Sequence, residues 1–189
     1  MERALQDRSH WEMVTGMVAI VIGVVSLAFT AYTAGLQRKQ AEAGVWPHVS
    51  WTYSQMPNAP EIHIVNKGVG PAIIRDVRVH FEDKVAHSWS EVGAAAFGAT
   101  ERHQVIFGEF IYGDFSGAVF SPGEDHTALE LKVPLTAEEA KKMTSGLRIS
   151  VCYCSTFGDC FWLDDFASKR RETTPVERCP APGPDSFEN

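Results

Sequence analysis

The chain has 189 residues and a formal net charge of −7 at pH 7, with 24 acidic and 17 basic side chains. This acidic balance argues against a nucleic-acid partner, because nucleic-acid-binding proteins carry a basic patch and the densest basic run here is only residues 169–171. Once an apolar N-terminal stretch and a Pro-rich tail are set aside, the remaining length suits one domain of ordinary size.

A transmembrane helix is predicted over residues 13–37, which contain no charged side chain. A bilayer core needs about 20 apolar residues in a helix, and a single span must be helical because lipid offers its backbone no hydrogen-bond partner. A cleaved signal peptide is the alternative. It has a basic N-terminal region and an apolar core of about 7–15 residues, whereas the flank 1–12 carries acidic residues and the core here is longer.

Small side chains recur along this segment at alternating spacings of three and four residues. Such a seam lets helix backbones approach closely in lipid and favours helix association, so we expect a homo-oligomer through the membrane helix as well as contact with the lipid bilayer. The alternative is that small residues are simply common in membrane helices. The seam consists of Gly16, Ala19, Gly23, Ser26, Thr30 and Thr33.

The charges that flank the span leave its orientation balanced. Arg3 and Arg8 precede it, and Arg38 and Lys39 follow it directly. Positive residues near the ends of a span favour the cytoplasmic side, and here the two flanks carry equal numbers.

Beyond the span we expect a juxtamembrane segment over residues 38–46 and one β domain over residues 47–171. Apolar and polar side chains alternate in several short segments, such as residues 49–53 and 147–153, and this period is typical of strands with one buried face. Residues 105–112 are expected to form another strand. About seven strands joined by short turns favour a mainly β fold, an immunoglobulin-like sandwich.

Two further segments have local signatures. The run Thr136-Ala137-Glu138-Glu139 predicts a helix that begins with a capping box. Residues 172–189 form a tail that contains four prolines, and this composition favours an extended or disordered chain.

A turn signature in the first half of the chain carries a resemblance. The residues are Asn66-Lys67-Gly68-Val69-Gly70-Pro71-Ala72, preceded by Arg38-Lys39-Gln40 and Val45-Trp46-Pro47. They resemble uncharacterised bacterial single-pass membrane proteins with a small β domain that carries an Asn-x-Gly-x-Gly-Pro-Ala turn. The resemblance implies a bacterial inner-membrane location and no activity. In physical terms, Gly68 and Gly70 permit positive φ, and Pro71 fixes the entry to a strand.

All four cysteines lie in the last quarter of the chain. A symmetric hairpin over the loop 155–159 places Cys154 opposite Cys160, on the face that the alternating core residues leave polar, so these two can form a disulfide while Cys179 staples the tail to Cys152. Three interpretations remain open. They are structural disulfides on the oxidising side of a membrane, free thiols in the cytoplasm, and a zinc site, whose usual ligand spacing the Cys-x-Cys pair does not match.

No catalytic, cofactor-binding or metal-binding set of residues is predicted. The seven histidines are dispersed, with His63 and His80 on polar strand faces, and the adjacent Asp164 and Asp165 point to opposite faces of a strand. The sequence favours a membrane-anchored, non-catalytic binding module with an unknown protein partner, in the manner of a subunit of an envelope complex. The alternatives are a thiol-redox protein or other small tethered enzyme, and a sensor or defence component that signals through helix association. The cysteines favour a periplasmic location for the domain.

Overall fold

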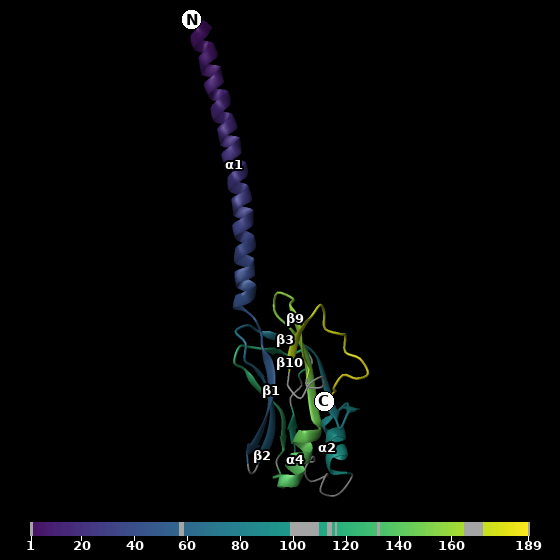
Figure 1. The fold of residues 1–189 in the computed structure, drawn as a ribbon. Coiled ribbons are helices and arrows are strands. Elements are labelled where there is room, and N and C mark those ends of the chain that lie inside the picture. The colour runs from purple at the N-terminus through teal and green to yellow at the C-terminus, as the bar shows by residue number, and fades with distance from the viewer. Residues whose placement is uncertain are drawn as a thin grey trace. The chain divides into compact units, whose positions relative to one another are not determined.

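The computed structural model describes residues 2–56, 59–98, 110–112, 115, 117–131, 133–164 and 172–188. The chain divides into two compact units, Met1–Ala43 and Gly44–Asn189 (Figure 1). The first unit is helical and the second is β-rich, which confirms the prediction of a long apolar N-terminal helix followed by a mainly β remainder.

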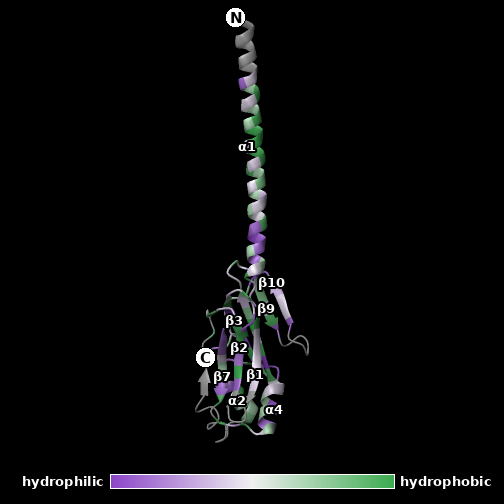
Figure 2. Ribbon diagram, turned by 90° about the vertical axis from the view of Figure 1, so that its left-hand side faces the viewer, coloured by the Kyte–Doolittle hydropathy of each residue, from purple (hydrophilic) through white to green (hydrophobic). Residues whose placement is uncertain are grey.

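The N-terminal unit belongs to one helix, α1, which runs over Glu2–Gly44. Its stretch Trp11–Gly44 is long and apolar enough to cross a membrane. Figure 2 shows hydrophobic residues along the middle of α1 and hydrophilic residues toward its C-terminal end. The juxtamembrane residues continue the helix rather than breaking it, and an ion pair of 2.9 Å between Arg38 Nε and Glu42 Oε1 spans one turn there, where it adds a few tenths of a kcal/mol.

The second unit contains two antiparallel sheets. The first has the order β1-β2-β7-β5, and the second has the order β10-β9-β8-β3-β4, with β6 also paired to β3. Strands of the first sheet are β1 (Val49–Met56), β2 (Ala59–Asn66), β7 (Asp125–Leu131) and β5 (Phe110–Tyr112). Strands of the second are β10 (Glu172–Val176), β9 (Cys160–Asp164), β8 (Leu147–Cys154), β3 (Ala72–Phe81), β4 (Lys84–Ala86) and β6 (Val119–Phe120). The start of the strand expected at 105–112 lies outside the described residues.

Side chains from both sheets form one continuous hydrophobic core. Trp51 and Ile64 enter it from the first sheet, and Val79, Ile149 and Val151 enter it from the second. Since successive strand residues point to opposite faces, the period-two pattern of the sequence identifies these inward positions.

Among the described residues, two short helices lie between strands. Helix α2 covers Trp89–Phe97, and α4 covers Ala137–Gly146. The predicted capping box is confirmed at α4, where the Thr136 hydroxyl accepts a hydrogen bond from the Glu139 amide (3.3 Å) and the Glu139 carboxylate accepts one from the Thr136 amide (2.7 Å).

The described part of the C-terminal tail, residues 172–188, is an ordered part of the domain, which corrects the expectation of disorder and leaves the extended alternative. Its first residues form β10 against β9, and Cys179 is covalently bound to β8. The Ser186 hydroxyl donates to the carboxylate of Asp76 (2.7 Å), and the ring of Phe187 packs edge-on against Trp89 at 5.0 Å. These long-range contacts offset the entropy of ordering the chain, and proline content alone does not reveal them.

Candidate functional site

The Asn-x-Gly-x-Gly turn is organised by the fully buried side chain of Asn66. Its Oδ1 accepts hydrogen bonds from the amides of His48 (3.2 Å) and Gly68 (3.0 Å). Its Nδ2 donates to the carbonyls of Gly70 (2.8 Å) and Phe120 (3.0 Å). One side chain therefore joins the start of the β domain, the turn and strand β6.

The two glycines of this turn are needed for close approach and not for their backbone angles. Neither has a positive φ, so the expectation from backbone freedom is wrong. A Cβ atom on Gly68 would collide with the backbone of Trp46 and His48, and one on Gly70 would collide with the carbonyl of Val45. The turn therefore packs directly on the chain that enters the domain, and Pro71 precedes the first residue of β3.

The four cysteines lie at the β8–β9 hairpin and the tail beside it. Residues Cys154 and Cys160 face each other in the register, and the structure joins them, as it joins Cys152 to Cys179. The hairpin register accounts for the first pair, whereas the bond between Cys152 and Cys179 depends on where the tail lies. The sequence separations are 6 and 27, so a chain-entropy model assigns stabilisations of about 2 and about 3.5 kcal/mol to the two bonds. All four sulfur atoms are paired, so the structure presents no thiolate for the zinc interpretation.

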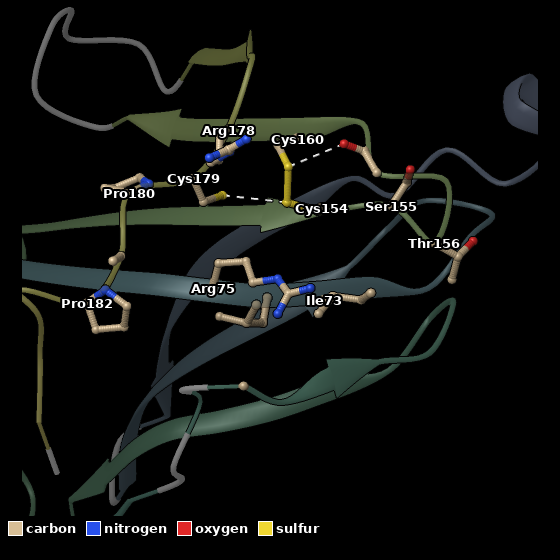
Figure 3. Close-up of a pocket in the computed structure, with 14 residues that line it drawn as sticks. Ile73, Arg75, Cys154, Ser155, Thr156, Cys160, Arg178, Cys179, Pro180 and Pro182 are labelled. Atoms are coloured by element: carbon tan, nitrogen blue, oxygen red, sulfur yellow. Dashed lines mark hydrogen bonds between the residues drawn. A yellow bond between two sulfur atoms is a disulfide. The ribbon is translucent and has the colours of Figure 1, made fainter.

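The two disulfides touch. The Sγ atoms of Cys154 and Cys179, which belong to different bonds, lie 3.7 Å apart (Figure 3). This is a van der Waals contact between sulfur atoms, because neither sulfur carries a proton. The cluster is close to the surface at Cys160 and Cys179, each of which is 9% exposed.

An open groove of about 680 Å³ adjoins this sulfur cluster. Its walls come from β3, the end of β8, the hairpin loop and the tail. Figure 3 shows Arg75 on β3 and Arg178 on the tail near the sulfur atoms. The lining residues are Ile73, Ile74, Arg75, Gly117, Cys154, Ser155, Thr156, Gly158, Cys160, Arg178, Cys179, Pro180, Ala181 and Pro182.

Among the described residues that line the groove, arginine is the one charged type. Arg75 and Arg178 are exposed, and within the described part of the chain no carboxylate pairs with either of them. Arg78, on the same strand as Arg75, provides a contrast. Its Nε lies 2.9 Å from the carboxylate of Asp76, and its guanidinium lies 5.1 Å from the centre of the Trp162 ring. The groove therefore offers two free cationic groups that can hold an anion.

The hairpin loop that forms one end of the groove is held by Ser155. Its hydroxyl accepts hydrogen bonds from the amides of Phe157 and Asp159, both at 3.2 Å, and lies 3.4 Å from the Asp159 carboxylate. These bonds give the backbone amides of the turn their hydrogen-bond partners within the loop itself and so fix its conformation.

A second polar cluster lies on the first sheet around His63. Its Nε2 lies 2.7 Å from Glu61, and its Nδ1 lies 2.8 Å from Asp125. Burial lowers the pKa of His63, but the hydrogen bonds and charges of the two carboxylates raise it by more, so the pKa lies above its ordinary value. His63 was expected on a polar strand face, and the sequence did not indicate its two partners.

The small-residue seam lies on α1. Among the described residues, no atom comes within 4 Å of a Cβ built on Gly16 or Gly23, and the seam has room for a partner helix, as do the other exposed faces of the span. The hydroxyl of Thr30 donates to the Ser26 carbonyl (2.8 Å), and that of Thr33 donates to the Thr30 carbonyl (2.9 Å). The hydroxyl protons are therefore used within the helix, which leaves close packing as the main source of association.

Sequence reasoning missed both arginines of the groove. One local signal was present for Arg75, because the inward residues Ile74 and Val77 are three positions apart instead of two. That interruption marks a β-bulge. Arg178 had no such signal, since its position depends on where the tail is anchored.

No family model matches the chain, and no curated protein is detectably similar to it. Function is therefore inferred from the residues and their geometry.

Proposed function

We propose that the chain is a single-pass protein of a bacterial cell membrane whose β domain is a non-catalytic binding module. The observation that carries the proposal is the disulfide-braced groove with its two arginines, neither of which has a carboxylate partner in the described part of the chain. A rigid concave surface with unsatisfied cationic groups suits recognition of a partner. The module would contribute this surface to a larger envelope complex.

The proposed location follows from two features. Helix α1 has the length and apolarity of a membrane span, and disulfides form and persist on the oxidising side of a membrane. With the domain on that side, the N-terminus lies in the cytoplasm, and Arg3 and Arg8 are the charges that hold it there. The disulfides therefore favour one orientation of the helix, which the equal numbers of basic residues in the two flanks leave undecided.

The order of the strands supports an immunoglobulin-like sandwich. In constant-type immunoglobulin domains one sheet has the order A-B-E-D and the other has C-F-G. When β1, β2, β3, β5, β7, β8 and β9 are taken as A to G, the two sheets read β1-β2-β7-β5 and β3-β8-β9. Strands β4, β6 and β10 are additions to this pattern. Such sandwiches present loops at their ends, and the hairpin loop 155–159 forms part of the groove.

The open small-residue face of α1 supports self-association within the membrane. Two domains tethered in this way would offer two grooves, which raises avidity for a partner with repeated sites. The same association is the basis of the alternative in which the protein is a sensor or defence component.

Site-directed photo-crosslinking in living cells tests the binding role. A photoreactive benzoyl-phenylalanine replaces Thr156, which is exposed at the groove, and the matched control carries it at the exposed Lys142 on α4. We expect a discrete crosslinked adduct from the groove position only. Equal adducts from both positions, or none from Thr156, would contradict a binding role for this groove.

A second candidate function is thiol–disulfide exchange, which the 3.7 Å contact between Cys154 and Cys179 favours. An external dithiol would reduce the bond between Cys152 and Cys179 and leave as a disulfide, transferring two electrons and two protons. The Cys179 thiolate would then attack the Cys154 sulfur and displace Cys160 as a thiolate. The product has one disulfide, between Cys154 and Cys179, and two thiols.

Two matched serine variants separate exchange from a purely structural role. In Cys152→Ser, exchange predicts that non-reducing peptide mapping finds the Cys154–Cys179 bond and a labelled Cys160. In Cys179→Ser the attacking thiol is absent, so the Cys154–Cys160 bond stays intact. A Cys152→Ser protein in which Cys179 alone reacts with maleimide would eliminate the exchange function.

A further inference from the structure

We propose that the groove binds an extended peptide segment of a partner protein, and that this segment carries Asp or Glu side chains beside apolar ones. The inference rests on the proposed role of the domain as a binding module and names the chemistry of its ligand. Charge, strand geometry and the shape of the groove each support it.

The charge of the groove is opposite to that of the chain. The protein has a net charge of −7, yet the described residues that line the groove include Arg75 and Arg178 and no acidic side chain. Glu177 is adjacent to Arg178 in the sequence and exposed, but it does not line the groove. A guanidinium without a partner forms short, charge-assisted and often bidentate hydrogen bonds with a carboxylate, so an acidic segment is the complementary ligand.

Arg75 lies at an irregularity in the pairing of β3 with β8. Ile74 pairs with Tyr153 and Asp76 pairs with Cys152, so Arg75 is the extra residue of a β-bulge with no residue opposite it. Bulges re-aim side chains and occur often beside functional sites. Here the bulge allows consecutive residues of β3 to differ in role, with the Asp76 carboxylate buried under the tail and the Arg75 guanidinium exposed at the groove.

The shape of the groove favours a chain over a small molecule. Small-molecule sites bury most of their ligand, whereas this groove is open to solvent. Its apolar surface comes from Ile73, Pro180 and Pro182, which can pack against the apolar side chains of an extended peptide. A peptide compensates for partial burial with its length, as in other peptide-recognition grooves.

Disulfides fix two parts of the groove wall, the tail and the β8–β9 hairpin. Arg178 immediately precedes Cys179, which is bonded to Cys152 on β8, and the hairpin end is closed by the bond between Cys154 and Cys160. A preorganised surface loses little conformational entropy on binding. The tail wall would therefore hold Arg178 in place before the ligand arrives.

The test uses the full chain in nanodiscs of zwitterionic lipid, panned with a phage-displayed random heptapeptide library. Enriched peptides should be rich in Asp and Glu with apolar neighbours. A fluorescent synthetic copy of the most enriched peptide is then titrated by anisotropy against the wild type and the charge-reversal variants Arg75→Glu and Arg178→Glu. Each should weaken binding by at least about tenfold, the equivalent of one charge-assisted hydrogen bond.

The matched control is Lys141→Glu, which makes the same change of charge at an exposed position on α4 and should leave affinity unchanged. Arg75→Gln is a milder variant that keeps the test informative should a charge reversal disturb folding, since exposed substitutions of this kind alter stability by less than about 0.5 kcal/mol. It should also weaken binding.

Three outcomes would overturn the inference. Enriched peptides without acidic residues would contradict the proposal of an acidic ligand, but not the proposal that the domain is a binding module. Retention of no peptide would remove peptide recognition, and the crosslinking experiment at Thr156 would then decide the proposed function by itself. Loss of peptide binding in nanodiscs of anionic lipid, with restoration by Arg75→Glu, would assign the arginines to lipid headgroups instead.

Discussion

Replacing Asn66 by Ala is expected to remove one of the largest single contributions to the stability of the β domain. The buried amide makes four hydrogen bonds to backbone groups of His48, Gly68, Gly70 and Phe120. At about 1 kcal/mol for each bond, the free energy of unfolding should fall by about 4 kcal/mol. Domains of this size are stable by only about 5–15 kcal/mol, so this one substitution should remove between about a quarter and most of the stability of the domain.

Urea unfolding of the compact unit that begins at Gly44, with its disulfides intact, provides the assay. The buried indoles of Trp51 and Trp89 supply the fluorescence signal. Asn66→Asp is the more specific variant, because it keeps both acceptor bonds but turns an oxygen toward two carbonyls, and it should be at least as destabilising as Asn66→Ala. Lys67→Ala, which changes an exposed side chain next to it, should alter stability by less than about 0.5 kcal/mol. A loss below about 1 kcal/mol for Asn66→Ala would refute the role of Asn66 as the organiser of the turn.

A Cβ on Gly70 would collide with the carbonyl of Val45, so Gly70→Ala should cost about 3 kcal/mol or more in the same unfolding assay, and a smaller loss would show that the turn can move. The raised pKa of His63 contributes stability that is complete below its unfolded pKa of about 6.5 and is lost as pH rises through the folded pKa. The stability difference between wild type and His63→Gln should therefore shrink between pH 6 and 9, and a difference that grows over this range would contradict the assignment. Gly23→Leu places a bulky group on the open face of α1, and an unchanged signal in a membrane two-hybrid assay of the isolated helix would remove the seam from the account.

Local sequence patterns were sufficient wherever the determining contacts are local. Alternation identified the inward faces of β1 and β8 because strand side chains have a strict period of two. The loop 155–159 set the register of the β8–β9 hairpin, and that register placed Cys154 opposite Cys160. The capping box at Thr136 lies within four residues of sequence and could be recognised directly.

Features that depend on distant contacts could not be recognised in this way. The tail is ordered by Cys179, Ser186 and Phe187, whose partners lie far back in the chain. The sequence indicated that Gly68 has a special role. The structure shows that the reason is the close approach of the backbone at residues 46–48, and not a positive φ. The groove lies where the fold brings β3 next to the tail, so its two arginines are far apart in the sequence and close only in the folded domain.

The central claim is a disulfide-braced binding domain on the oxidising side of a membrane. Labelling of native membranes with maleimide–polyethylene glycol under non-reducing conditions, followed by peptide mapping, tests it most directly. The account predicts that no cysteine is labelled before reduction, that the mapped bonds are Cys152–Cys179 and Cys154–Cys160, and that alkaline carbonate leaves the protein in the membrane. Labelling of all four thiols without reductant, together with an inactive C-terminal alkaline phosphatase fusion, would place the domain in the cytoplasm and contradict the account.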